Sequence, residues 1–192
     1  RDLRMSRGLG DVYKRQSLNN RIIFSFLYEP LFAVTDGYEA EPILAESYLV
    51  TDDGKTTTVK LRSGVTFHDG TAMTAADAAY SIASAMGSEY YGSRLRFIIE
   101  AQAQDDLTLV LATSEAYECL PLLLDIPIIK AGTKDDASPM GTGPYAFADT
   151  KLVRCQNWWQ DSEPLADFDE IALTISSTAA DVRDNFEYQK VN

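Results

Sequence analysis

The segment from residue 64 to residue 82, GVTFHDGTAMTAADAAYSI, constrains the possible folds of this chain more than any other. It places a strand end before a His-Asp-Gly turn, in which Gly70 can adopt a positive φ. Thr74 stands three residues before Asp77, which is the spacing of a capping box at a helix N-terminus. The helix that follows carries a stripe of mostly small apolar residues, Ala75, Ala78, Ala79, Ile82 and Met86. The segment therefore predicts a helix that packs closely against a sheet, and it contains no obvious catalytic residue.

Strands and a second helix around this segment predict a mixed α/β fold. The sequences ILAESYLV and TTTVKL flank an Asp-Gly turn, which is a strong signal for a hairpin. A further turn and strand are expected at 105–113, where leucines alternate with other residues. Residues 18–32 have the apolar spacing of a helix that ends at Pro30.

The second half of the chain predicts more strands and one boundary. Residues 88–106 are expected to run from a loop into a strand, and residues 145–159 and 168–176 are expected to form further strands. Between them, the polar loop at 130–144 is rich in Gly and Pro and is the best candidate for a boundary within the chain.

Composition and charge narrow the classes of function. The formal net charge of −12 argues against a nucleic-acid surface, which needs clustered Lys and Arg, and against attraction to anionic lipid. Apolar residues make up 45% of the chain, enough for a core. No apolar run approaches the roughly 18 residues of a transmembrane helix. Two cysteines, Cys119 and Cys155, are too few for a disulfide framework or a zinc site; we expect two small buried residues, with a disulfide as the alternative.

Residues 1–16 differ from the rest of the chain. They carry five basic and two acidic residues, a net charge of +3, whereas the remainder carries 12 basic and 27 acidic residues, a net charge of −15. The stretch shows no apolar periodicity, and GLGDVYKRQ resembles translated adapter sequence. We expect residues 1–16 to be a non-native, adapter-derived arm, with the native sequence beginning near Ser17. A native, mobile basic arm is the alternative.

Seven segments, in the same order, resemble the peptide- and nickel-binding family, family 5, of extracellular solute-binding proteins that serve ABC importers. They are YEPL (28–31), LAES (44–47), DDGKT (52–56), LRSGVTFHDGTAMTAADAAYS (61–81), GTGPY (141–145), NWW (157–159) and FDEI (168–171). The resemblance covers nearly all of residues 18–192 and about the N-terminal third of a full-length member.

The resemblance implies a bilobed, periplasmic-binding-protein type II-like fold, of which this chain holds an incomplete first lobe. Residues 17–32 and 141–192 would belong to the main subdomain of lobe I and residues 33–140 to its accessory subdomain. Lobe II, the first strand of the family and the lipid-modified cysteine of many members would be absent. Hinge closure between two lobes would trap the ligand.

The function implied is that of a binding protein and not of an enzyme. It would bind oligopeptides, dipeptides or similar small solutes outside the cytoplasm and deliver them to the permease subunits of an ABC importer. No cofactor and no metal are expected. The membrane would be contacted only through the missing lipid anchor, and no nucleic acid would be bound. A peptide-sensing regulatory domain on the same fold and, third, a hydrolase are the alternatives.

Tyr90, Tyr91 and Arg94 are the best candidates for ligand contacts. They lie between an apolar helix and a strand, where aromatic rings can cover a ligand while their hydroxyls bind it. The resemblance implies a cleft-facing aromatic at about this place. It also aligns Asn20 and Arg21 with another cleft-facing position. The alternative is that the tyrosines pack on the surface without binding anything.

Other chemistry-bearing residues favour structural interpretations. His68, the only histidine, is expected to be an exposed turn residue, not part of a Ser-His-Asp arrangement or a metal site. GTGPY lacks the lysine and third glycine of a phosphate loop and is expected to be a turn between subdomains. Trp158 and Trp159 are expected in the core. No arginine occurs at 122–132, where some nickel-type members place one, so nickel specificity is not supported.

Overall fold

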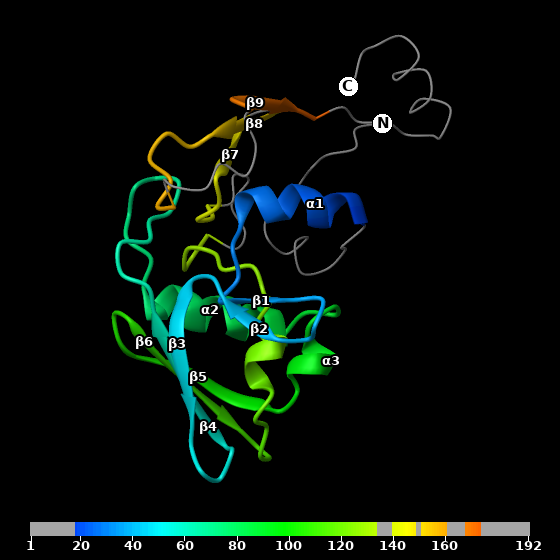
Figure 1. The fold of residues 1–192 in the computed structure, drawn as a ribbon, viewed down its shortest axis with the longest axis vertical. Coiled ribbons are helices and arrows are strands. Elements are labelled where there is room, and N and C mark those ends of the chain that lie inside the picture. Colours follow the sequence, from blue (N-terminus) through cyan, green and yellow to red (C-terminus); the bar gives the residue numbers. More distant parts are fainter. Residues whose placement is uncertain (1–17, 134–139, 149–150, 161–167, 174–192) are drawn as a thin grey trace.

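A computed structural model describes residues 18–133, 140–148, 151–160 and 168–173, with side chains described from Ile22 onward. The fold mixes helices and antiparallel strands, as the sequence predicts (Figure 1). The elements, in order, are α1 (Leu18–Leu27), β1 (Phe32–Val34), β2 (Ala40–Pro42), β3 (Ala45–Val50), β4 (Thr56–Leu61), α2 (Ala75–Met86), α3 (Gly92–Leu95), β5 (Ile98–Asp105), β6 (Thr108–Thr113), the 3₁₀ helix η1 (Leu120–Leu123), β7 (Tyr145–Ala148), β8 (Lys151–Arg154) and β9 (Glu170–Ala172).

The largest sheet is four-stranded and antiparallel, in the order β3-β4-β6-β5. The expected hairpin joins β3 to β4, and its turn is fixed by the Thr51 hydroxyl, which donates to the Asp53 carboxylate at 2.6 Å. The register between β4 and β6 pairs Thr57 with Leu111 and Val59 with Leu109, and these four side chains lie on one buried face of the sheet. That face is the one that α2 covers.

Helix α2 packs against β5 and β6 (Figure 1). The capping box at its N-terminus is confirmed: the Asp77 carboxylate accepts the backbone N–H of Thr74 at 2.9 Å and the Thr74 hydroxyl at 2.8 Å. The buried face differs in part from the expected stripe. Ala75, Ala78 and Ile82 are buried as expected, but Ala79 and Met86 are only partly buried, and Ser81 and Ala85 are buried in the same face. Small side chains let the helix axis approach the sheet closely. The preceding turn also forms as expected, with Gly70 at a φ of 80°.

A second, three-stranded antiparallel sheet has the order β7-β8-β9, and α1 packs against β7. Figure 1 shows α1 and this sheet at one end of the molecule and the four-stranded sheet with α2 and α3 at the other. The rings of Phe26 and Tyr145 meet edge to face, with centroids 5.5 Å apart. The Tyr145 hydroxyl donates to the Phe168 carbonyl at 2.7 Å. The assignment of these parts to a main and an accessory subdomain stays a prediction.

The segment GTGPY (141–145) connects the two ends of the molecule and packs tightly against the backbone of the last turn of α1. A Cβ atom on Gly141 would overlap the Leu27 carbonyl oxygen, and one on Gly143 would overlap that of Phe26. Side chains larger than hydrogen are therefore excluded at both positions. The Gly143 carbonyl also accepts a hydrogen bond from His68 Nε2 at 3.0 Å. The segment is thus bound to α1 and to the turn before α2.

Several expectations about single residues and short elements are wrong. His68 is half-buried and hydrogen-bonded, not an exposed turn residue, because the 141–143 segment covers it. Cys119 is exposed and Cys155 half-buried, so neither is a fully buried small residue, and both are free thiols. The expected loop at 88–97 contains the short helix α3, and the paired strands β1 and β2 were not expected. No helix in the described part of the chain is long and apolar enough to span a membrane.

Candidate ligand-binding site

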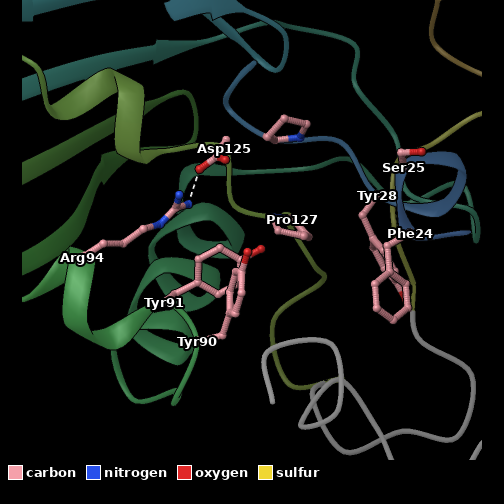
Figure 2. Close-up of a pocket in the computed structure, with 9 residues that line it drawn as sticks. Phe24, Ser25, Tyr28, Tyr90, Tyr91, Arg94, Asp125 and Pro127 are labelled. Atoms are coloured by element: carbon pink, nitrogen blue, oxygen red, sulfur yellow. Dashed lines mark hydrogen bonds and ion pairs between the residues drawn. The ribbon is translucent and has the colours of Figure 1, made fainter. Parts of the chain in front are cut away.

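A pocket of about 170 Å³ opens between α1, α3 and the segment that follows η1 (Figure 2). The residues that line it come from three stretches far apart in the sequence. They are Phe24, Ser25, Tyr28, Pro30, Tyr90, Tyr91, Arg94, Asp125 and Pro127. An isolated backbone bridge between Pro30 and Pro127 brings the first and third stretches together.

Aromatic rings form two opposite sides of the pocket. On one side Tyr90 and Tyr91 meet edge to face, with centroids 4.8 Å apart and planes at 83°. Tyr91 is buried, at 3% exposure, whereas Tyr90 is 43% exposed. On the other side, Phe24 of α1 and Tyr28, the residue directly after α1, make a similar pair with centroids 5.8 Å apart (Figure 2). Of the two tyrosines from the α2–α3 connection, Tyr90 is therefore the one whose ring a ligand can reach.

Hydrogen bonds of the Ser88 hydroxyl stabilise the turn that carries the two tyrosines. The Ser88 hydroxyl donates to the Ala85 carbonyl at 2.8 Å and accepts the backbone N–H of Tyr91 at 3.0 Å. This arrangement turns the chain directly after α2 and starts α3. The sequence predicts a loop here because Gly87 and Gly92 interrupt any helical pattern, but the serine side chain supplies the local order.

Arg94 is held by three groups at once. Its Nη2 donates to the Asp125 carboxylate and to the Leu123 carbonyl, the second at 3.3 Å. Its guanidinium carbon lies 4.8 Å from the centroid of the Tyr91 ring, within the range of a cation–π contact. The Arg94 and Asp125 side chains are 30% and 33% exposed, so the ion pair faces the pocket without being sealed from water.

The structure brings together three of the five residues that the sequence predicts for the site. Tyr90, Tyr91 and Arg94 all line the pocket. Asn20 and Arg21 belong to the start of α1, but their side chains lie outside the described part of the structure. Their role, like that of the other three in ligand binding, stays a prediction.

The remaining lining residues were not predicted, although the sequence held a signal for some of them. Phe24 and Tyr28 are four residues apart on one helical stretch, a spacing that places two aromatics on one helix face. Asp125 lies in the stretch 122–132, whose sequence lacks arginine and predicts no ligand contact. Nothing in the sequence pairs Asp125 with Arg94, because the contact depends on how η1 packs.

A second polar cluster lies near the end of α1 and is structural. Glu29 is 7% exposed, and its carboxylate accepts the Trp159 indole N–H at 2.7 Å. Burial raises the pKa of Glu29 above its ordinary value, and hydrogen bonds from Trp159, Thr142 and Trp158 offset part of that rise. The Trp158 indole donates to the Thr142 carbonyl at 3.0 Å. Neither tryptophan lines the pocket, but both are only partly buried: Trp159 packs against the core, and Trp158 does not lie in it as expected.

The described residues offer no arrangement for metal binding or for nucleophilic catalysis by histidine. No group of three or more His, Cys, Asp or Glu side chains within the described ranges could hold a metal ion. Burial lowers the pKa of His68 below its ordinary value, and its ring nitrogen faces a backbone carbonyl instead of a nucleophile. What the pocket can do chemically is to cover one side of a small solute and stack aromatic rings on it.

Comparison with known proteins places the chain in a family. Residues 39–191 match the family described as bacterial extracellular solute-binding proteins, family 5 Middle. The glutathione-binding protein GsiB of Escherichia coli O1:K1 is 28% identical over 176 residues, which cover 82% of this chain and 34% of that protein. The chain thus spans about a third of the length of the curated relatives it matches.

Solved structures show the same fold. NikA from Brucella suis, in complex with Fe(III)-EDTA, superposes with a TM-score of 0.78 at 20% identity and covers 97% of this chain and 41% of its own. The oligopeptide-binding protein AppA from Bacillus subtilis, in complex with a nonapeptide, gives 0.73 at 18% identity, over 94% and 40%. The expected mixed α/β fold of part of a solute-binding protein is confirmed. On the match over 39–191, the chain belongs to family 5 of the bacterial extracellular solute-binding proteins, which serve ABC importers.

Proposed function

We propose that this chain forms part of the ligand-binding lobe of a protein that captures peptides or similar small solutes for an ABC importer. The observation that carries the proposal is the pocket, in which the half-exposed Tyr90 faces Phe24 of α1 and Tyr28 directly after it. Rings on two sides of a hollow can cover the apolar part of a solute, and tyrosine hydroxyls can bind its polar groups.

The size of the pocket supports a site with two walls. Ligand pockets that enclose a solute measure about 300–1,000 Å³. The pocket here measures about 170 Å³, too small to enclose a peptide by itself. A second lobe, closing by a hinge, would supply the opposite wall, with residues 17–32 and 141–192 in the main subdomain and 33–140 in the accessory subdomain of the first lobe.

The remaining parts of the proposal follow from the family. Family 5 solute-binding proteins of ABC importers are extracytoplasmic. We place this protein there too, with the permease subunits as its partner and a lipid anchor as its link to the membrane. It would bind and deliver its ligand without altering it chemically.

Calorimetry tests the proposal directly. The proposed longer, two-lobed protein would be titrated with a mixed library of di- to pentapeptides and, because a relative is named for it, with glutathione. We expect binding, and we expect Tyr90→Ala to weaken it by about 1–2 kcal/mol through loss of a stacked ring. Tyr48→Ala, which removes a tyrosine of 44% exposure outside the pocket, is the matched control. Absence of binding to every member would refute the proposal, and equal affinity of Tyr90→Ala and wild type would remove Tyr90 from the site.

A further inference from the structure

The charges in the pocket lining cancel one another. Among the nine described lining residues, Arg94 is the one cation and Asp125 the one anion. They form an ion pair, and the same Arg94 nitrogen also donates to the Leu123 carbonyl. The guanidinium is therefore neutralised in place and fixed over the Tyr91 ring.

The rest of the lining carries no charge. Facing the ion pair are the exposed side of the Tyr90 ring, the Phe24–Tyr28 pair and Pro127 (Figure 2). Because Arg94 and Asp125 are each about one-third exposed, a ligand group can come close to either. Such a ligand group would contact the Arg94–Asp125 ion pair and the aromatic rings beside it.

This arrangement disfavours a charged ligand group of either sign. A carboxylate that approaches Arg94 also approaches the Asp125 carboxylate, and the repulsion between the two carboxylates offsets what the ligand gains from the guanidinium. An ammonium group meets the reverse problem with the guanidinium. An uncharged ring or side chain has neither cost, since it needs only the apolar and aromatic surface beside the pair.

We propose that Asp125 is a specificity-determining residue: by pairing with Arg94 it keeps this wall neutral, so that the wall receives an uncharged, aromatic or apolar part of the ligand and rejects a carboxylate. The inference rests on the proposed function, because it assumes that the pocket contacts a solute. It identifies Asp125, which acts through Arg94, as the residue whose removal converts the wall into an anion site.

Three probes of one shape separate the effect of charge from that of size. Benzamide, benzoate and benzamidine share a phenyl ring and carry a neutral, a negative and a positive group. Each would be titrated into the 192-residue chain at pH 7, with dissociation constants taken from the NMR shifts of the Tyr90 and Tyr91 ring protons. The variants are Asp125→Asn, Arg94→Gln and the double variant. The control is Asp52→Asn, which changes the net charge by the same amount as Asp125→Asn but at an exposed position outside the pocket.

We expect the wild type and Asp52→Asn to bind benzamide more tightly than either charged probe. Asp125→Asn should improve benzoate relative to benzamide by at least about threefold, the size of a modest exposed charge interaction. Arg94→Gln should do the same for benzamidine, and the double variant should again prefer benzamide. If Asp125→Asn does not fold, Arg94→Gln with benzamidine carries the test.

Three results would overturn the inference: benzoate preferred by the wild type, unchanged charge selectivity in the folded variants, or no shift of the tyrosine signals by any probe. The peptide titration of the longer protein is read separately. If the longer protein binds peptides but the variants show unaltered charge selectivity, only the role of Asp125 is refuted. If no peptide binds, the proposed function is refuted, whereas the titration of the three probes still shows whether Asp125 sets the charge selectivity of the pocket.

Discussion

His68 shows how one distant contact decides the chemistry of a side chain. Its Nε2 lies 3.0 Å from the carbonyl oxygen of Gly143, 75 residues further along the chain. A carbonyl only accepts hydrogen bonds, so the ring must carry its proton on Nε2. Burial lowers the pKa of His68, while the bond to Gly143 and the nearby Asp69 carboxylate oppose that shift. The neutral ring with its proton on Nε2 is therefore the form that the lowered pKa favours at neutral pH, and it can donate this bond.

The first prediction at this scale concerns acid pH. Because the pKa of His68 is lower in the folded than in the unfolded chain, the stability that its neutral form provides is complete above the unfolded value, about 6.5. It is lost as pH falls below 6.5 through the folded pKa. The free energy of unfolding, measured by urea denaturation between pH 7.5 and 5.5, should fall toward the acid end. His68→Gln keeps a donor for Gly143 without titrating, and it should flatten this slope; an equally steep slope would show that another group is responsible.

The sequence locates single residues better than it locates their partners. It places Tyr90, Tyr91 and Arg94 at one site because they are neighbours along the chain. It cannot pair Arg94 with Asp125, or His68 with Gly143, because those contacts depend on packing between distant segments. For the same reason His68 reads as an exposed turn residue although the folded chain half-buries it.

At the scale of elements, α2 joins local signals to tertiary packing. Asp77, the third residue of α2, completes the capping box: one of its carboxylate oxygens accepts the backbone N–H and the hydroxyl of the N-cap Thr74. The other oxygen accepts the backbone N–H of Ala131 at 2.8 Å. Ser81, inside the buried face, binds the backbone of Ile129 through both its donor and its acceptor. Helix α2 thus packs against the four-stranded sheet and also binds the 129–131 segment through hydrogen bonds.

The prediction for this element ranks four substitutions in and beside α2. Thr74→Ala should lower the free energy of unfolding by about 1 kcal/mol through a weakened cap. Asp77→Ala should cost more, about 2–3 kcal/mol, because it also leaves the N–H of Ala131 without its acceptor. Ile82→Ala, fully buried, should cost about 2–5 kcal/mol. Ala83→Gln, on the exposed face, exchanges one good helix former for another; it is the control and should stay within about 0.5 kcal/mol of wild type. Denaturant titration gives all four values, and an Asp77→Ala as mild as Thr74→Ala would rule out the link to residue 131.

Elements with strong local signals were predictable, and elements without them were not. The capping box of α2 and the Asp-Gly hairpin between β3 and β4 depend on residues within a few positions of one another. The strands β1 and β2 have three residues each, too few for an alternating pattern to stand out. Helix α3 spans only Gly92–Leu95 and begins with a glycine, so it has little local signal; hydrogen bonds of Ser88 and Arg94 help to hold it in place.

At the scale of the whole molecule, the junction at GTGPY sets the pocket. Gly141 and Gly143 lie against the backbone of residues 26 and 27, within one helical turn of the lining residue Phe24. The opposite side of the pocket belongs to α3, at the end of the molecule that holds the four-stranded sheet (Figure 1). The shape of the pocket therefore depends on how the two ends meet, which no short stretch of sequence records.

The last prediction compares this chain with the proposed two-lobed protein. Affinity for a solute depends on how much of its surface the site encloses, and tight sites bury roughly 70% or more of it. A pocket of about 170 Å³ on one wall leaves most of a peptide in water. We therefore expect the 192-residue chain to bind peptides more weakly than about 1 mM, roughly −4 kcal/mol. Calorimetry of both proteins against the same di- to pentapeptide library gives the contrast. Micromolar binding by the 192-residue chain alone, abolished by Tyr90→Ala, would show that this wall suffices and that no second lobe is needed for capture.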